Sequence, residues 1–466
     1  MGDGPQPGGR SRPVAWVLAG LLGAFLVARF VIWSRGVVFV TNDAGSYVWH
    51  GGRGFDRGPL LSLTGHAPRL WGTPLLYALL PGDPARVFAQ WALGTLAWGL
   101  LAWVVAARLR TGPGKIVGAA GILLLALMPQ VAAWDFTILS EPLSITLGVS
   151  TLALLLQWLA TGSRAALVGL TATAFWLVFV RPELWLVVAV VALVLVVRAW
   201  RDRAHRRPPA LAYGALLVAI TWVNLITPTM SQTYADRSFG LTLEEATFNY
   251  RLRMQVLPNP EIATVYREQL GMPRCTALEE TAKLGGWRMT RIISAYLTCP
   301  ELVAWGKENA RSSGWRFARA APGLYARETM RTLPLALGGA TYGRSGVLLP
   351  PAVTGAAFPA EPARVLPRLF GGLALALAAA VATGAWRRRR LLVATGAVLA
   401  LVSIAAILAE LLFAAGEYGR FGIQEAIWFR VAVWLIAAAA LDTALERLRR
   451  RRRAGPAAPE STPAAG

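Results

Sequence analysis

Asp43 is the first residue along the chain whose type and setting could serve a reaction. It lies in the stretch FVTNDAGSYVW, residues 39–49, about ten residues after the first long apolar run ends. A carboxylate in this position could accept a proton from a reacting group. The pair Asn42-Asp43 could instead cap a helix that begins at Ala44, because Asn and Asp are favoured at helix starts. Choosing between these roles requires the elements that position Asp43.

The composition of the chain indicates an integral membrane protein. Of the 466 residues, 55% are hydrophobic and only 15% are charged, and the mean hydropathy is +0.47. These values lie outside the usual range of soluble domains. Long apolar runs recur toward both ends of the chain, so one cleavable signal peptide does not account for them.

Ten apolar runs are each close to the length that crosses a hydrocarbon core of ~30 Å. They cover residues 14–33, 87–107, 116–133, 143–160, 165–180, 184–200, 210–227, 368–386, 391–415 and 427–445. The predicted fold class is therefore an all-α polytopic membrane protein with about ten transmembrane helices.

Basic residues fix the predicted orientation, because Arg and Lys near the ends of spans are retained on the cytoplasmic side. With the N-terminus inside, every inside segment is basic and holds in total 21 of the 47 Lys and Arg. These residues are Arg10, Arg12, Arg108, Arg110, Lys115, Arg164, Arg198, Arg201, Arg203, Arg206, Arg207, Arg387 to Arg390, Arg447 and Arg449 to Arg453. The net charge of +22 is thus explained by topology near anionic lipid, and we expect no nucleic-acid partner.

The same orientation divides the chain into a membrane part and an outer part. The predicted units are an N-terminal membrane module 1–227 with a first outer loop 34–86, an outer lobe 228–366, C-terminal membrane helices 367–453 and a disordered cytoplasmic tail 454–466. The lobe has ordinary globular composition. It is predicted to be mostly helical because Thr242 with Glu245 and Thr276 with Glu279 have the spacing of capping boxes.

The two cysteines of the chain, Cys275 and Cys299, both lie in the predicted outer lobe. In an oxidising compartment they can form a disulfide; the alternative is two buried thiols. Two cysteines and three scattered histidines do not make a zinc site. No GxxxxGK[ST] motif occurs, so we expect no ATP handling. The many arginines and few lysines of this Ala-rich chain favour a bacterial plasma membrane.

Polar residues gather at the predicted outer surface and not at mid-span, where a transporter would carry its ionisable groups. This arrangement suits an enzyme whose substrate headgroup lies at the membrane interface. Four features resemble the GT-C superfamily of polyprenyl-phosphate-sugar-dependent glycosyltransferases, which includes bacterial mannosyl- and arabinofuranosyltransferases. They are a short first span, a long first outer loop with Asp43-Ala-Gly-Ser-Tyr47, a later span opening with Ser140-Glu141-Pro142, and a late Glu417-x-x-Arg420.

The resemblance implies transfer of a sugar from a lipid phosphate to an acceptor hydroxyl, with inversion. Asp43 would be the general base, and the donor phosphate would be held by arginines, since guanidinium binds phosphate in a bidentate manner. The candidates for phosphate binding are Arg420, Arg430, Arg181 and Arg69, and those for substrate binding are Tyr47, Asp135, Glu141 and Glu417. The expected partners are a polyprenyl-phosphate-linked sugar, a glycan, lipid or peptide acceptor, and membrane lipid.

Several alternatives remain open at this point. Glu141 could be an ordinary residue of a first helical turn, and Arg420 could serve mainly as the ion-pair partner of Glu417. The acidic pair of the family is here Asn42-Asp43, which argues against a metal cofactor because hard divalent cations need several oxygen ligands. The protein could also be a non-enzymatic carrier or flippase of a polyprenyl-linked glycan, or a ligase that transfers a whole glycan.

Overall fold

The computed structural model describes residues 12–48, 69–202, 207–283, 289–341, 349–413 and 417–454. Within these ranges the chain is helical, and its extended pairing is limited to one isolated bridge between Phe39 and Thr137. The predicted all-α class is thus confirmed for the part of the chain that is described. Most of the predicted tail, and residues 49–68 of the first outer loop, lie outside the described residues.

Eight of the described helices are long and apolar enough to cross a membrane. They are α1 (Arg12–Arg35), α3 (Gly82–Arg108), α6 (Glu141–Thr161), α8 (Trp185–Arg201), α9 (Arg207–Phe239), α17 (Pro362–Ala382), α19 (Arg390–Phe413) and α21 (Ile423–Ala454). With the turn η4 (Pro182–Leu184) that precedes it, α8 forms a span of 20 residues. Their number and length identify a multi-pass membrane protein.

Two further elements bear on the predicted count of ten. The helix α4 (Gly112–Ala126) and the following segment Pro129–Phe136, which contains α5 (Pro129–Ala132) and η3 (Ala133–Phe136), are bent by 57° and together form a ninth candidate span. The apolar helix α7 (Arg164–Val180) has 17 residues and falls short of the length criterion. Each of the ten predicted runs overlaps one of these elements, but the described helices that meet the criteria number eight or nine.

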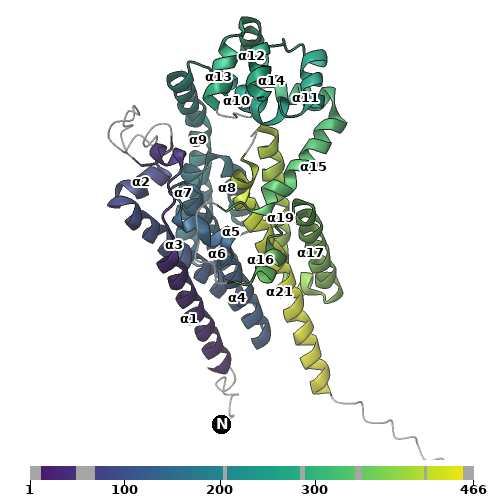
Figure 1. Ribbon diagram of the computed structural model, residues 1–466. Helices are drawn as coiled ribbons and strands as arrows, with labels where there is room; N and C mark the ends of the chain where they lie inside the picture. Colours follow the sequence, from purple (N-terminus) through teal and green to yellow (C-terminus); the bar gives the residue numbers. More distant parts are fainter. Residues whose placement is uncertain are drawn as a thin grey trace, which may run out of the picture.

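A lobe of short helices caps one end of the bundle, which we call the lobe end. It consists of α10 (Leu243–Arg251), α11 (Pro260–Thr264), α12 (Thr276–Lys283), α13 (Met289–Leu297) and α14 (Pro300–Ala320). Figure 1 shows the lobe above the bundle, at the end opposite the first residues of α1. The helix α15 (Pro322–Gly338) leads back to the bundle (Figure 1). The lobe has an aromatic core in which Phe248, Tyr266 and Tyr296 are buried.

The two predicted domain boundaries fall inside helices. The boundary at residue 227 precedes Pro228 within α9, and the boundary at residue 366 precedes Pro367 within α17. A proline interrupts an apolar run and removes one backbone hydrogen bond, yet both helices continue through it. The first boundary therefore lies within the helix that leads toward the lobe, and the second lies within a helix of the bundle.

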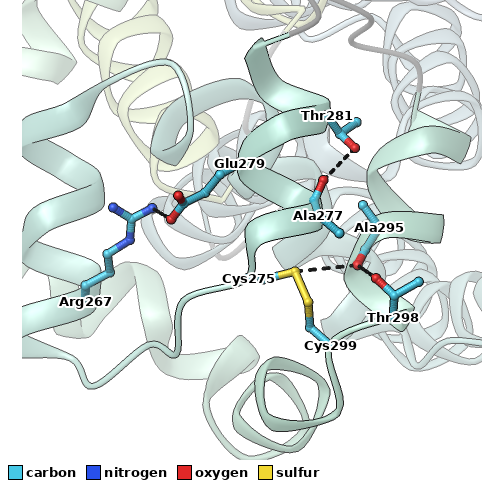
Figure 2. Close-up of a disulfide and its surroundings, with 8 residues drawn as sticks. All are labelled: Arg267, Cys275, Ala277, Glu279, Thr281, Ala295, Thr298 and Cys299. Atoms are coloured by element: carbon cyan, nitrogen blue, oxygen red, sulfur yellow. Dashed lines mark hydrogen bonds and ion pairs between the residues drawn. A yellow bond between two sulfur atoms is a disulfide. The ribbon is translucent and has the colours of Figure 1, made fainter.

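The predicted capping box at Thr242 is confirmed. Thr242 Oγ1 accepts from the N–H of Glu245, and the Glu245 carboxylate accepts from the N–H of Thr242. The predicted capping box at Thr276 is wrong, because α12 begins at Thr276 itself and the Glu279 carboxylate accepts from Arg267 instead. Cys275 and Cys299 form a disulfide with Cα atoms 5.9 Å apart. It links the residue before α12 to the residue that caps α14 (Figure 2).

The opposite end of the bundle is held by one buried carboxylate. Asp442 on α21 accepts from the N–H and the hydroxyl of Thr111, both at 2.7 Å, and from Arg389 Nε at 2.6 Å. Thr111 caps α4, and Arg389 directly precedes α19. Asp442 thus ties α4, α19 and α21 together at the end of the bundle opposite the lobe.

Candidate active site at the lobe end

Asp43 is positioned by a short contact between two chain segments. The N–H of Phe39 donates to the carbonyl of Phe136 at 2.8 Å, and the N–H of Ile138 donates to the carbonyl of Phe39 at 3.1 Å. Gly36 lies against the ring of Phe136 with no room for a Cβ atom, which lets the chain turn closely over that ring. The loop after α1 is thereby fixed beside the segment that precedes α6.

The interpretation of Asp43 as a helix cap is wrong. The turn of 3₁₀-helix η1 (Asn42–Ser46) contains Asp43 in its first turn, and its cap residue is Thr41, which makes no side-chain capping bond. The Asp43 carboxylate instead accepts from Arg420 Nη1 at 2.7 Å, across 377 positions of the chain. With 44% of its side chain exposed, Asp43 is also open to solvent.

Arg420 is the centre of the site. It lies on the short helix α20 (Tyr418–Phe421) with 8% of its side chain exposed. Besides Asp43, its guanidinium donates from Nε to Glu141 Oε1 at 2.6 Å and from Nη1 to Glu417 Oε2 at 3.0 Å. Burial lowers the pKa of Arg420, but the carboxylates of Glu141 and Asp43 raise it by more, so the group stays charged.

The three carboxylates around Arg420 come from separate segments. Glu141 is the first residue of α6 and only 2% exposed, whereas Glu417 directly precedes α20 and is 37% exposed. Glu417 is the one non-glycine residue of the described chain with a positive φ, at 49°. Such a conformation costs free energy and is held only where the surroundings require it. In this strained conformation the Glu417 carboxylate accepts a hydrogen bond from Arg420.

Tyr47 extends this network. Its hydroxyl lies 3.1 Å from Ser140 Oγ, which in turn donates to Glu141 Oε2 at 3.4 Å. Arg69 packs over the Tyr47 ring at 4.6 Å and donates to Ser46 Oγ at 3.0 Å. Burial raises the pKa of Tyr47, so its phenol is neutral near pH 7. Asp43, Tyr47, Arg69, Glu141, Glu417 and Arg420 therefore form one connected cluster.

Arg181 lies next to this cluster, at the C-terminal end of α7. It is 2% exposed, and its Nε donates to Glu183 Oε1 at 2.6 Å. Burial lowers the pKa of Arg181, but the charges of Glu183 and then of Glu141 raise it by more, so Arg181 stays charged. Its Nη1 is buried and has no hydrogen-bond partner among the described residues. A buried donor of this kind is costly unless a ligand or water satisfies it.

Three polar side chains at the start of α21 also have unsatisfied atoms within the described structure. They are Gln424 Nε2, Glu425 Oε2 and Trp428 Nε1, each on a side chain that is almost fully buried. Gly148 on α6 lies against Gln424 and Trp428, where a Cβ atom would collide with both. Ser144, one turn above Gly148, donates to Gln424 Oε1 at 3.3 Å. These groups therefore lie just below Glu141.

An apolar groove begins at Gly148 and Trp428. It has a volume of about 210 Å³ and is lined by aliphatic residues of α6, α7, α8 and α19. On α6 its lining runs from Gly148 to Leu159, which are 11 residues or about 16 Å apart along a helix. The groove thus runs along the membrane-spanning part of the bundle, and its end at Gly148 and Trp428 is the end nearer the polar cluster.

Two predicted site residues have other partners. Arg430 donates to the carbonyls of Leu337, Ala357 and Ala426 and packs over the ring of Phe358 at 3.7 Å. These bonds join α21 to the last residues of α15 and of α16 (Pro351–Ala357), while Arg430 Nη2 has no hydrogen-bond partner among the described residues. Asp135 accepts from Arg29 on α1 at 2.6 Å, and both side chains are buried. We therefore assign both residues to holding the bundle together.

The lobe reaches the site through a turn of π-helix, η6 (Leu252–Val256). Gln255 in this turn donates to the hydroxyl of Tyr418 at 3.0 Å, two residues from Arg420. Burial raises the pKa of the neighbouring Tyr250, and the charge of Glu417 raises it further. The lobe thus covers one side of the cluster.

The structure adds Gln424, Glu425, Trp428 and Glu183 to the residues identified from the sequence. Gln424, Glu425 and Trp428 stand at the start of the last apolar run, where isolated polar residues resemble interfacial anchors. Their one signal in the sequence is the spacing of Gln424 and Trp428, four residues apart and hence on one helix face. Comparison with known protein families and with curated proteins finds no match to this chain.

Proposed function

We propose that the protein is a membrane glycosyltransferase that moves a sugar from a polyprenyl-phosphate donor to an acceptor hydroxyl. The acceptor would be a glycan, lipid or peptide, and the reaction would take place at the outer face of a bacterial plasma membrane. The proposal agrees with the resemblance of the sequence to the GT-C superfamily. Its main support, however, comes from the geometry of the lobe end.

One observation carries the proposal. Asp43, Glu141 and Arg420, from three distant segments, meet at the lobe end, and Glu141 is seven residues of α6, about 10 Å, from Gly148 at the near end of the apolar groove. A polar reaction site over a hydrocarbon-lined groove fits a substrate with a long lipid chain and a polar head. A polyprenyl-phosphate sugar has this form.

In this proposal Arg420 and Arg181 have different roles. The three hydrogen bonds of Arg420 to side chains all go to carboxylates, so it is suited to holding Asp43 and Glu141 in place. Within the described part of the chain, Arg181 Nη1, Gln424 Nε2 and Trp428 Nε1 are buried donors without a hydrogen-bond partner, and Gln424 and Trp428 lie against Gly148 at the end of the groove. The lipid phosphate would bind to these three donors, with its isoprenoid chain in the groove.

In this proposal Asp43 is the base and the lipid phosphate is the leaving group. The acceptor oxygen attacks the anomeric carbon from the side opposite the phosphate, a C–O bond forms, and the bond from carbon to phosphate oxygen breaks. Asp43 takes the proton of the acceptor hydroxyl. One of its oxygens holds Arg420, and the exposed part of the carboxylate faces the side from which the acceptor arrives. The electron pair leaves on the polyprenyl phosphate, whose charge Arg181 stabilises.

A carrier of the same lipid would also need an apolar groove and cationic groups but no base. The two functions separate in liposomes that contain the wild type, Asp43→Asn or the matched control Asp83→Asn. Asp83 also forms a partly exposed pair with one arginine, Arg86, at 2.7 Å. A transferase should lose sugar transfer in Asp43→Asn by at least ~10²-fold and keep it in Asp83→Asn. The protein is a carrier instead if the wild type transfers no sugar and Asp43→Asn translocates the lipid as fast as the wild type does.

A further inference from the structure

The metal that GT-C-like acidic pairs imply can be tested against the residues that would bind it. A divalent cation of the Mg²⁺ or Mn²⁺ type needs several carboxylate or carbonyl oxygens, which bind Mg²⁺ at about 2.0–2.1 Å. Glu183 pairs with Arg181, whereas the carboxylates next to the acidic-pair position are those of Asp43, Glu141 and Glu417. All three are bonded to the guanidinium of Arg420. Among the described residues no group of three or more His, Cys, Asp and Glu is arranged to hold a metal ion.

The residues present therefore do not fit a metal, and the reason is the position of Arg420. Asp43 Oδ2 and Glu417 Oε2 both accept from Nη1, so these oxygens are separated by no more than the sum of the two bond lengths, 5.7 Å. The third oxygen, Glu141 Oε1, accepts from the neighbouring Nε. A cation at the centre of these oxygens would occupy the volume of the guanidinium.

We infer that Arg420 is a built-in cation that takes the place of a divalent metal among three carboxylates, so that the site works without metal. In this role it is a positioning residue, because it acts through the carboxylates that it holds. A guanidinium suits the role because it stays charged when buried and offers several donors in one plane. The neighbouring carboxylates also keep the pKa of Arg420 high.

Removal of the Arg420 side chain leaves three carboxylates, one of them 2% exposed, around an empty space. Their mutual repulsion favours the binding of a cation there. Arg420→Ala should therefore gain a divalent metal site that the wild type lacks.

The test measures Mn²⁺ binding to purified full-length protein in detergent by electron paramagnetic resonance. We expect no bound Mn²⁺ in the wild type or in Arg420→Lys, and one bound Mn²⁺ in Arg420→Ala. The double variant Arg420→Ala with Glu141→Gln should bind Mn²⁺ at least ~10-fold more weakly, because it has lost one of three oxygen ligands. A folded Arg420→Ala protein that binds no Mn²⁺ contradicts the inference.

A second measurement uses the wild type alone and decides the matter if Arg420→Ala does not fold. Donor consumption should be the same in EDTA and in Mn²⁺. Loss of activity in EDTA with recovery in Mn²⁺, or stoichiometric Mn²⁺ binding to the wild type, overturns the inference. The activity measurement rests on the proposed glycosyltransferase function. The Mn²⁺ measurement does not, so a wild type that consumes no donor refutes the function while the resonance spectra still test the role of Arg420.

Discussion

Replacement of Asp43 by Asn should affect turnover much more than stability. The carboxylate is 44% exposed and pairs with an arginine that keeps two other carboxylate partners. Exposed pairs contribute only about 0–1 kcal/mol to stability, so the Asn variant should fold normally. Loss of a general base lowers the rate by about 10²–10⁴-fold, which is about 3–5 kcal/mol of transition-state free energy.

Asp135→Asn is the matched opposite. Asp135 also pairs with one arginine, Arg29, but the two side chains are only 10% and 1% exposed. Removal of one partner leaves the other charge buried and unpaired, at a cost of about 3–5 kcal/mol. Asp135→Asn should thus lower stability strongly, with turnover per folded molecule reduced less than in Asp43→Asn.

The assay compares donor consumption by each variant, normalised to the folded fraction from thermal unfolding in detergent. The reasoning fails if Asp43→Asn keeps more than about half of the wild-type turnover, since a base contributes far more than twofold. It fails equally if Asp43→Asn is as unstable as Asp135→Asn, because its carboxylate would then be a structural group.

Three further predictions concern the groove, the lobe and the orientation. Ala394→Leu, on α19 in the lining of the groove, should narrow the groove and raise the donor KM at least ~10-fold, whereas Gly99→Leu, at a position with open space, should leave it unchanged. Replacement of both cysteines by Ser should lower lobe stability by about 3 kcal/mol, seen as faster proteolysis of the lobe; equal proteolysis rates would contradict this. In a background without native cysteines, an impermeant thiol reagent added from outside should label a cysteine at position 300 and not one at position 388, and the reverse pattern would invert the proposed orientation.

The sequence is most informative where a polar residue lies within about ten residues of the end of an apolar run. Asp43, Glu141 and Arg420 stand at such places, so their presence at one membrane surface follows from topology. Their mutual contacts do not, because residues 377 positions apart meet only through the packing of the bundle. That Asp43 and Arg420 form one cluster was therefore a hypothesis that needed the structure.

The apolar pattern that reveals the spans does not show which side chains of a span contact other helices. Gln424 and Trp428 lie at the edge of an apolar run, and nothing in the run tells whether its face is turned to lipid or to other helices. The apolar pattern likewise does not show that Arg430 Nε and Nη1 donate to carbonyls at the C-terminal ends of two other helices. Pro228 ended one predicted span early and Pro367 made another begin late, because the apolar pattern does not show that a helix continues through a proline.

The central claim is that this protein transfers a sugar from a lipid phosphate with Asp43 as the base. The most direct measurement incubates the purified protein with a panel of polyprenyl-phosphate sugars and an extract of bacterial envelope acceptors, with mass spectrometry to follow each donor. We predict that the wild type consumes one donor and releases polyprenyl phosphate, and that Asp43→Asn does so at least ~10²-fold more slowly. A wild type that leaves every donor intact, or an Asp43→Asn variant that consumes the donor as fast as the wild type, would contradict the account.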